Sequence, residues 1–150
     1  MIQRIQSVYL LLAFVAIVAS MMLPVGDFFK DGILSAELSN LWLLTTDGQH
    51  IMLPYVALFA ALAIAATLTI IDIFLFKNRR LQMTICTIIM FIILLYVIFL
   101  GYCAYFRLQG ESFTPTLFAS FPFASFILVA LARKAINNDE KLIRSVDRLR

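Results

Sequence analysis

Four long stretches without a formal charge dominate this sequence. Residues 5–26, 51–71, 81–106 and 112–132 each run for at least 20 residues without Asp, Glu, Lys or Arg. An α-helix needs roughly 20 apolar residues to cross the hydrocarbon core of a bilayer. A water-soluble bundle would carry polar residues at helical spacing, and these stretches have almost none. The sequence therefore predicts four transmembrane helices.

The predicted fold is an all-α membrane protein, a four-transmembrane-helix bundle that forms a single membrane domain over residues 1–150. The expected helices cover about 3–23, 52–76, 81–106 and 114–132. The composition agrees, because 63% of the residues are hydrophobic and only 14% are charged, whereas a soluble domain is about half apolar and a quarter charged.

The loop at about 24–51 is long enough to hold structure of its own. It contains two Asp–Gly pairs, at 31–32 and 47–48, and each lies between apolar runs. Asp–Gly flanked by apolar residues is a strong signal for a β-hairpin. We therefore expect a small hairpin or meander of two to four strands here, on the exterior side of the membrane.

Positive charges gather at three places along the chain. Ten of the twelve Lys and Arg residues are Arg4, the three in segment 77–80, and those after residue 132. Loop 24–51 instead holds four acidic residues and one lysine. Loops rich in Lys and Arg stay in the cytoplasm, so both termini and the 77–80 turn are predicted to be cytoplasmic. The net charge of +3 thus indicates topology, and nucleic-acid binding is not expected.

Residues 133–150 are rich in charged residues, unlike the apolar spans. We expect an amphipathic cytoplasmic helix over about 137–150, because apolar residues recur there at helical spacing. Such a helix could lie on anionic lipid, dock on the bundle or bind another protein, and lipid or self-docking is favoured over a partner. The candidate surface consists of Leu142, Ile143, Arg144, Val146, Arg148 and Leu149.

Pro122 lies inside the predicted fourth span, between two copies of the tetrapeptide FASF. Proline removes a backbone hydrogen bond and usually kinks a helix. The sequence predicts a kink here. A bend in a helix-packing site is the favoured interpretation, and a hinge or a binding crevice is the alternative.

Asp72 is the one acidic residue that falls within a predicted span. It lies near the C-terminal end of its helix, where the helix dipole disfavours an anion. We therefore expect an ion pair with a nearby cation, and favour a structural role over a proton relay or a docking site. The candidate partners are Arg4 at the same predicted depth and, in the adjoining turn, Lys77, Arg79 and Arg80.

Clusters that carry catalysis or bind metal are not evident in the sequence. His50 is the single histidine, whereas a metal site usually draws on three or four ligands. A serine nucleophile needs a base, and no spacing links His50 to a serine. The sequence thus predicts no catalytic residues, no cofactor, no metal and no enzymatic activity.

Three stretches together carry a resemblance over the whole chain: MIQRIQSVYLLLA at the start, IDIFLFKNRRLQ across the 77–80 turn, and DEKLIRSVDRLR at the end. The chain resembles a family of small four-span bacterial inner-membrane proteins known only as a domain of unknown function. That resemblance implies the bacterial inner membrane as the location and brings no assigned activity. The layout is also similar to that of claudins, by analogy of architecture alone.

These observations lead to two functional expectations. The first is a non-enzymatic accessory or scaffold subunit of a membrane complex, whose partners are the lipid bilayer and another membrane-protein subunit. The alternative is a small transporter, a channel component or a lipid-binding protein with a crevice near Asp72 and Pro122. The sequence leaves homo-oligomerisation open.

Overall fold

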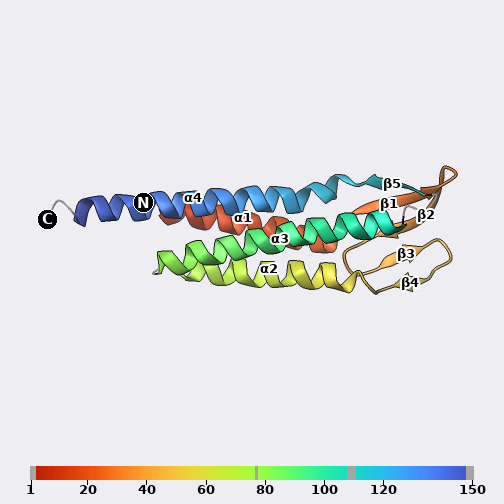
Figure 1. Ribbon diagram of the computed structural model, residues 1–150, viewed down its shortest axis with the longest axis horizontal. Helices are drawn as coiled ribbons and strands as arrows, with labels where there is room; N and C mark the ends of the chain where they lie inside the picture. The colour runs from red at the N-terminus through yellow and green to blue at the C-terminus, as the bar shows by residue number, and fades with distance from the viewer. Residues whose placement is uncertain (1–2, 77, 108–110, 148–150) are drawn as a thin grey trace.

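The computed structural model describes residues 3–76, 78–107 and 111–147, and the side chains of residues 5–76, 78–106 and 111–142. Its main body is a bundle of four helices, α1 (Gln3–Met22), α2 (Val56–Phe74), α3 (Arg79–Arg107) and α4 (Phe121–Asp147). The helices alternate in direction, and each packs on two neighbours: α1 and α3 both contact α2 and α4 (Figure 1). The chain ends and the α2–α3 turn lie at one end of the bundle, here called the basic end, and the strands lie at the other, the sheet end (Figure 1).

Each helix buries one narrow stripe of side chains that faces the bundle axis. On α2 the buried residues are Leu58, Leu62, Ala65, Ala66, Thr69 and Asp72, which recur every three or four positions. That spacing places them on a single helix face. Many large apolar side chains on the other faces are exposed, among them Phe91 at 61% and Ile98 at 61%. An apolar exterior is what a helix surrounded by lipid requires.

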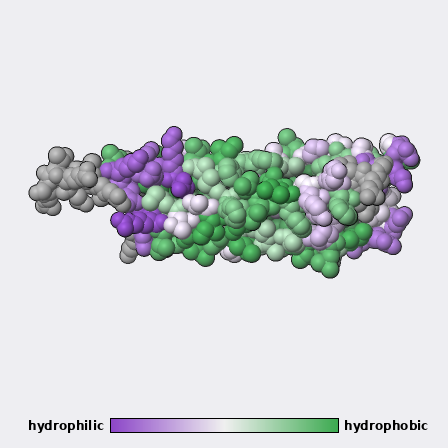
Figure 2. All heavy atoms as spheres, viewed as in Figure 1, coloured by the Kyte–Doolittle hydropathy of each residue, from purple (hydrophilic) through white to green (hydrophobic). Residues whose placement is uncertain are grey.

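All four helices are long and apolar enough to cross a membrane, over Ile5–Met22, Val56–Phe74, Arg79–Phe106 and Leu117–Leu142. A hydrophobic band occupies the middle of the molecule, and hydrophilic residues gather toward both ends (Figure 2). The prediction of four helices that could span a membrane is therefore confirmed.

A five-stranded antiparallel sheet covers the sheet end, in the order β4-β3-β2-β1-β5. Its strands are β1 (Gly26–Lys30), β2 (Ile33–Leu38), β3 (Leu43–Thr45), β4 (His50–Ile51) and β5 (Ser112–Pro115). The first four form the meander that the sequence predicted between α1 and α2. The all-α assignment is therefore only partly correct, because helices and sheet form the fold together.

Both Asp–Gly pairs make the expected turns. Asp31 and Gly32 join β1 to β2 with φ values of 51° and 80°, and Gly48 lies between β3 and β4 with a φ of 77°. Positive φ at both central residues, as in the first turn, is the geometry of two-residue hairpin turns, and a single glycine with positive φ, as in the second, occurs in longer hairpin loops. The prediction of hairpins at these positions is confirmed.

Strand β5 corrects the expectation that a helix begins at about residue 114. Residues 112–115 instead pair with β1, with Phe113 opposite Phe28 and Pro115 opposite Gly26. Phe28 is fully buried, and its ring lies 5.0 Å from that of Phe113, centroid to centroid. Proline is tolerated on an edge strand, because the side of the strand that lacks an N–H can face away from the neighbouring strand.

Helix α4 also differs from expectation, because it runs unbroken from Phe121 to Asp147. The expected separate helix over about 137–150 is, as far as Asp147, a continuation of α4. Pro122 lies in the first turn of α4, directly after a 3-10 turn at Leu117–Ser120. Proline costs little there, because the first turn has no helical acceptor for its N–H. Pro122 therefore helps to begin the helix, and does not occupy the middle of one as expected.

Candidate functional site

Buried polar side chains from all four helices meet near the basic end. The inward stripes of the helices are mostly apolar, yet toward this end each one carries a polar residue. We call this group the polar layer. It consists of Gln6 on α1, Asp72 on α2, Gln82 and Cys86 on α3, and Asp139 on α4, all buried.

Asp72 links α2 to α3. The thiol of Cys86 donates a hydrogen bond to Asp72 Oδ2 across 3.0 Å, and Gln82 Nε2 donates to the Asp72 backbone carbonyl across 3.1 Å. The Asp72 side chain is fully buried, and its other oxygen, Oδ1, has no hydrogen-bond partner among the described residues. An ionisable group within a membrane span is a candidate functional residue by default.

Gln6 links α1 to α4 in the same layer. Its amide Nε2 donates a hydrogen bond to Asp139 Oδ2, and both residues are buried. The polar layer therefore ties the helices in two pairs, α2 with α3 and α1 with α4. Buried polar groups cost free energy unless they are hydrogen-bonded, so these bonds favour one register of the helices over others.

The structure describes only two of the four cations expected to pair with Asp72. Arg79 and Arg80 do not pair with Asp72 within the described part of the chain. Arg80 Nε instead lies 3.7 Å from Glu140 Oε1 on α4. That pair is largely exposed on the arginine side, so it adds little stability. The side chain of Arg4 and all of Lys77 lie outside the described residues.

A second buried polar contact ties the sheet to the bundle. Asn40, in the connection between β2 and β3, is fully buried. Its Nδ2 donates to the backbone carbonyl of Ser20 on α1, and its Oδ1 accepts a hydrogen bond of 2.6 Å from the Tyr96 hydroxyl on α3. A residue of the β2–β3 connection thus enters the helix bundle and is held from two helices.

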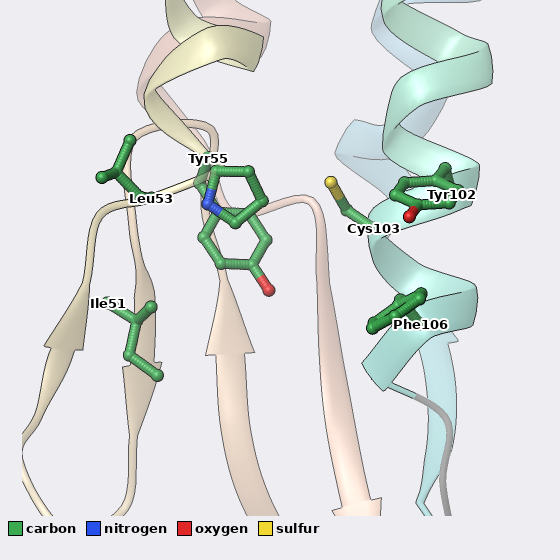
Figure 3. A pocket seen from close by; sticks show the side chains of 7 residues that line it. Ile51, Leu53, Tyr55, Tyr102, Cys103 and Phe106 are labelled. Carbon is green, nitrogen blue, oxygen red and sulfur yellow. The ribbon is translucent and has the colours of Figure 1, made fainter.

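A crevice of about 570 Å³ opens between the residues that lead from β4 into α2 and the last turns of α3. Its lining is apolar and aromatic, and the Cys103 thiol points into it from α3 toward Tyr55 (Figure 3). Such a site suits an apolar ligand with one polar end. The crevice is lined by Ile51, Leu53, Pro54, Tyr55, Tyr102, Cys103 and Phe106.

Two smaller cavities lie between α3 and α4. The first, here called the basic cavity, has about 240 Å³ and is lined by Met83, Ala130, Arg133, Lys134 and Asn137. The second, here called the apolar cavity, has about 120 Å³ and is lined by Ile93, Leu94, Val97, Phe123 and Phe126. Asp72 lines neither of them, nor the crevice at the sheet end.

Within residues 3–76, 78–107 and 111–147, no three His, Cys, Asp or Glu side chains converge as a metal site would require. Asp72 and Cys86 are the two such groups in direct contact in the polar layer. Two ligands are fewer than structural or catalytic metal sites use.

The predicted partner surface on the last helix falls mostly outside the described residues. Leu142 is 55% exposed. The side chains of Ile143, Arg144 and Val146 are not described, and Arg148 and Leu149 lie beyond the described range. Their amphipathic arrangement therefore stays a prediction from the sequence.

The polar layer could have been found only in part by reading the sequence. Gln6 continues the spacing of Leu10, Ala13 and Ile17, all buried on α1, so extending that stripe places Gln6 inside the bundle. Cys86 offers no comparable signal, because a free cysteine usually behaves as a small apolar residue.

A comparison with protein families gives one match. A family model described as "Domain of unknown function (DUF4293)" matches residues 2–149. No curated protein matches the sequence. The resemblance to a domain of unknown function is therefore confirmed over nearly the whole chain.

Proposed function

The chain belongs to the DUF4293 family, and we propose that it acts as a non-enzymatic accessory or scaffold subunit of a membrane complex. One observation carries the proposal: α4 continues past the other helices at the basic end. Asp139 still contacts Gln6, near the start of α1, but the helix runs on to Asp147. Those eight residues carry α4 about 12 Å past the Gln6 contact, whereas the three residues of α1 before Gln6 cover only about 4.5 Å.

The sequence of this extension fits a docking element. Leu142, Val146 and Leu149 recur at helical spacing among basic and acidic residues, and Leu142 is exposed. An amphipathic helix of this kind lays its apolar stripe into a groove on another protein. The extension would present that stripe outside the bundle core, where a partner subunit can reach it.

The polar layer supports a static role more than a transport role. A transport path needs a polar route that reaches the buried charge. Asp72 lines none of the three cavities in the site, and Gln82 and Cys86 hold it by hydrogen bonds. This arrangement favours a scaffold over a transporter or channel component.

The proposed orientation places the basic end in the cytoplasm and the sheet outside. Arg79, Arg80, Arg133 and Lys134 lie toward the basic end, which is the side that the positive-inside rule assigns to the cytoplasm. The resemblance to bacterial four-span proteins supports the bacterial inner membrane as the location. The partner would then meet α4 on the cytoplasmic side.

The test is purification of the tagged full chain from its native membranes in mild detergent, with Val146→Asp and Ser145→Asp compared in parallel. Both variants add one negative charge, but position 146 lies on the apolar stripe and position 145 does not. We expect a stoichiometric partner with the native chain and Ser145→Asp, and its loss with Val146→Asp. A partner retained equally by both variants, and by a chain ending at Glu140, would contradict the proposal.

A second candidate function is binding of an amphiphile at the sheet end, and the crevice of about 570 Å³ favours it. The test is binding of a fluorescent fatty acid to the chain in zwitterionic nanodiscs. Cys103→Trp fills the crevice, whereas Tyr105→Trp adds bulk at a position on the same helix that is 76% exposed. We expect the first variant alone to weaken binding, and equal binding by both would exclude this site.

A further inference from the structure

The groove between α3 and α4 is basic at one end and apolar at the other. The basic cavity and the apolar cavity share this groove, since residues of both helices line each of them. On α4, Phe123, Phe126, Ala130, Arg133 and Asn137 line the two cavities, and steps of three or four residues separate them. That spacing places all five on one face of the helix.

The facing side of α3 shows the same continuity. Met83 lines the basic cavity, and Leu94 and Val97 line the apolar cavity. Leu94 and Val97 follow Met83 by 11 and 14 residues, which are close to three and four helical turns. All three residues therefore lie on one face of α3. Met90, between them on the same face, is partly buried. The two cavities therefore lie along one face of each helix, in the interface between α3 and α4.

The length of the groove matches one leaflet of a bilayer. Arg133 and Phe123 are ten residues apart on α4, which corresponds to about 15 Å along the helix axis. Half of a hydrocarbon core of roughly 30 Å is also about 15 Å. A lipid whose headgroup lies at Arg133 would thus bring its acyl chain to the apolar cavity.

The positive charges at the basic cavity are suited to binding an anion. Arg133 and Lys134 line it, and no acidic residue does. The nearest acidic residues along α4 have other partners, since Asp139 accepts from Gln6 and Glu140 lies by Arg80. Arg133 directly follows the charge-free stretch 112–132, and a basic pocket between transmembrane helices at such a position is suited to an anionic lipid headgroup.

We propose that this groove binds one anionic phospholipid from the leaflet at the basic end. The lipid phosphate lies at Arg133, Lys134 and Asn137, and one acyl chain runs past Ala130 to Phe126. A partner helix is too wide for this groove, because a helix with its side chains is 10–12 Å across and the cavities hold about 240 and 120 Å³. This binding is independent of any protein partner at the end of α4.

The experiment measures lipid binding to the purified full chain by native mass spectrometry, with phosphatidylglycerol, phosphatidylcholine and inorganic phosphate as separate probes. We expect phosphatidylglycerol to bind more tightly than phosphatidylcholine, and inorganic phosphate not to bind. The double variant Arg133→Gln/Lys134→Gln should lose about 30-fold in affinity for phosphatidylglycerol at low salt. Lys30→Gln, at the sheet end, is the charge control and should bind as the native chain does.

A second pair of variants tests the apolar part of the groove. Ala130→Phe adds a ring between the two cavities, whereas Ala124→Phe adds the same ring at an exposed position on another face of α4. We expect only Ala130→Phe to weaken phosphatidylglycerol binding, with the helix content of both variants unchanged by circular dichroism. Equal binding of both phospholipids, phosphate binding as strong as lipid binding, or equal effects of the two phenylalanine variants would each overturn the proposal.

Discussion

Tyr96→Phe is expected to loosen the sheet from the helix bundle. The substitution removes one hydroxyl and keeps the ring, so the fully buried side chain loses almost no volume. What it removes is the donor of the 2.6 Å hydrogen bond to Asn40 Oδ1. Asn40 is then left with a buried acceptor that lacks its partner, while its Nδ2 still donates to the Ser20 carbonyl.

The expected cost follows from that unmade bond. A buried polar group without its partner costs about 1–3 kcal/mol, so Tyr96→Phe should lower the free energy of unfolding by about that amount. Asn40→Ala removes both bonds and should cost at least as much. Because both variants break the same Asn40–Tyr96 bond, their effects should not add. A double-mutant cycle should return a coupling of about 0.5–3 kcal/mol.

The assay is SDS-induced unfolding in mixed micelles, followed by tryptophan fluorescence. Trp42 is the single tryptophan of the chain and lies two residues after Asn40, so its signal reports the region where the sheet meets the bundle. Tyr102→Phe is the control, because it makes the same chemical change on α3 at a side chain that is 56% exposed. If Tyr96→Phe and Tyr102→Phe unfold alike, the reasoning from the buried hydrogen bond is refuted.

Three further substitutions are checked by the same unfolding assay. Gly26→Ala should disrupt the pairing of β1 with β5, because the new Cβ would lie 2.5 Å from the Phe113 ring; unchanged stability would contradict this. Phe28→Ala should cost about 3–5 kcal/mol, since this ring is fully buried, and a loss below 1 kcal/mol would oppose a packed core beneath the sheet. Cys86→Ala should cost about 1–3 kcal/mol by removing the donor to Asp72, whereas an effect near zero would mean that the thiol bond is unimportant.

Much of the fold could be predicted because local signals and the final structure agree. Each of the four charge-free stretches holds the apolar part of one helix, and the Asp–Gly pairs at 31–32 and 47–48 became hairpin turns. In both cases the determining interactions lie within a few residues along the chain. Hydrophobic length sets a membrane helix, and the positive φ of a tight turn favours particular residues.

One error falls where a distant segment decides the structure, and the other falls where a helix continues past a change in composition. Residues 112–115 could begin a helix by their local pattern, but β1 offers an open edge, and Phe113 packs on Phe28 across it. The end of α4 could be a separate helix by its change in composition. Nothing within that segment breaks the backbone, however, and the helix continues to Asp147. Tertiary contacts override local preference in the first case, and helix cooperativity does so in the second.

The partner of Asp72 shows why nearness along the chain was a poor guide to the site. Asp72 shares a helix face with Leu58, Leu62 and Thr69, all buried, so its side chain points into the bundle. Arg80 instead lies near Glu140 on α4. The direction in which a helical residue points depends on its angular position, which repeats every 3.6 residues. That position brings Asp72 to a thiol on α3 rather than to Arg79 or Arg80 at the start of the same helix.

The contact with Cys86 uses only one of the two carboxylate oxygens of Asp72. Cys86 donates to Oδ2, whereas Oδ1 is buried without a partner among the described residues. A link between α2 and α3 needs a single acceptor, and the neutral amide of an asparagine would supply one without burying a potential charge. A carboxyl group is therefore more than the helix contact requires. If Asp72→Asn leaves the stability of the bundle unchanged, the value of the carboxyl group must lie in what the protein does rather than in how it folds.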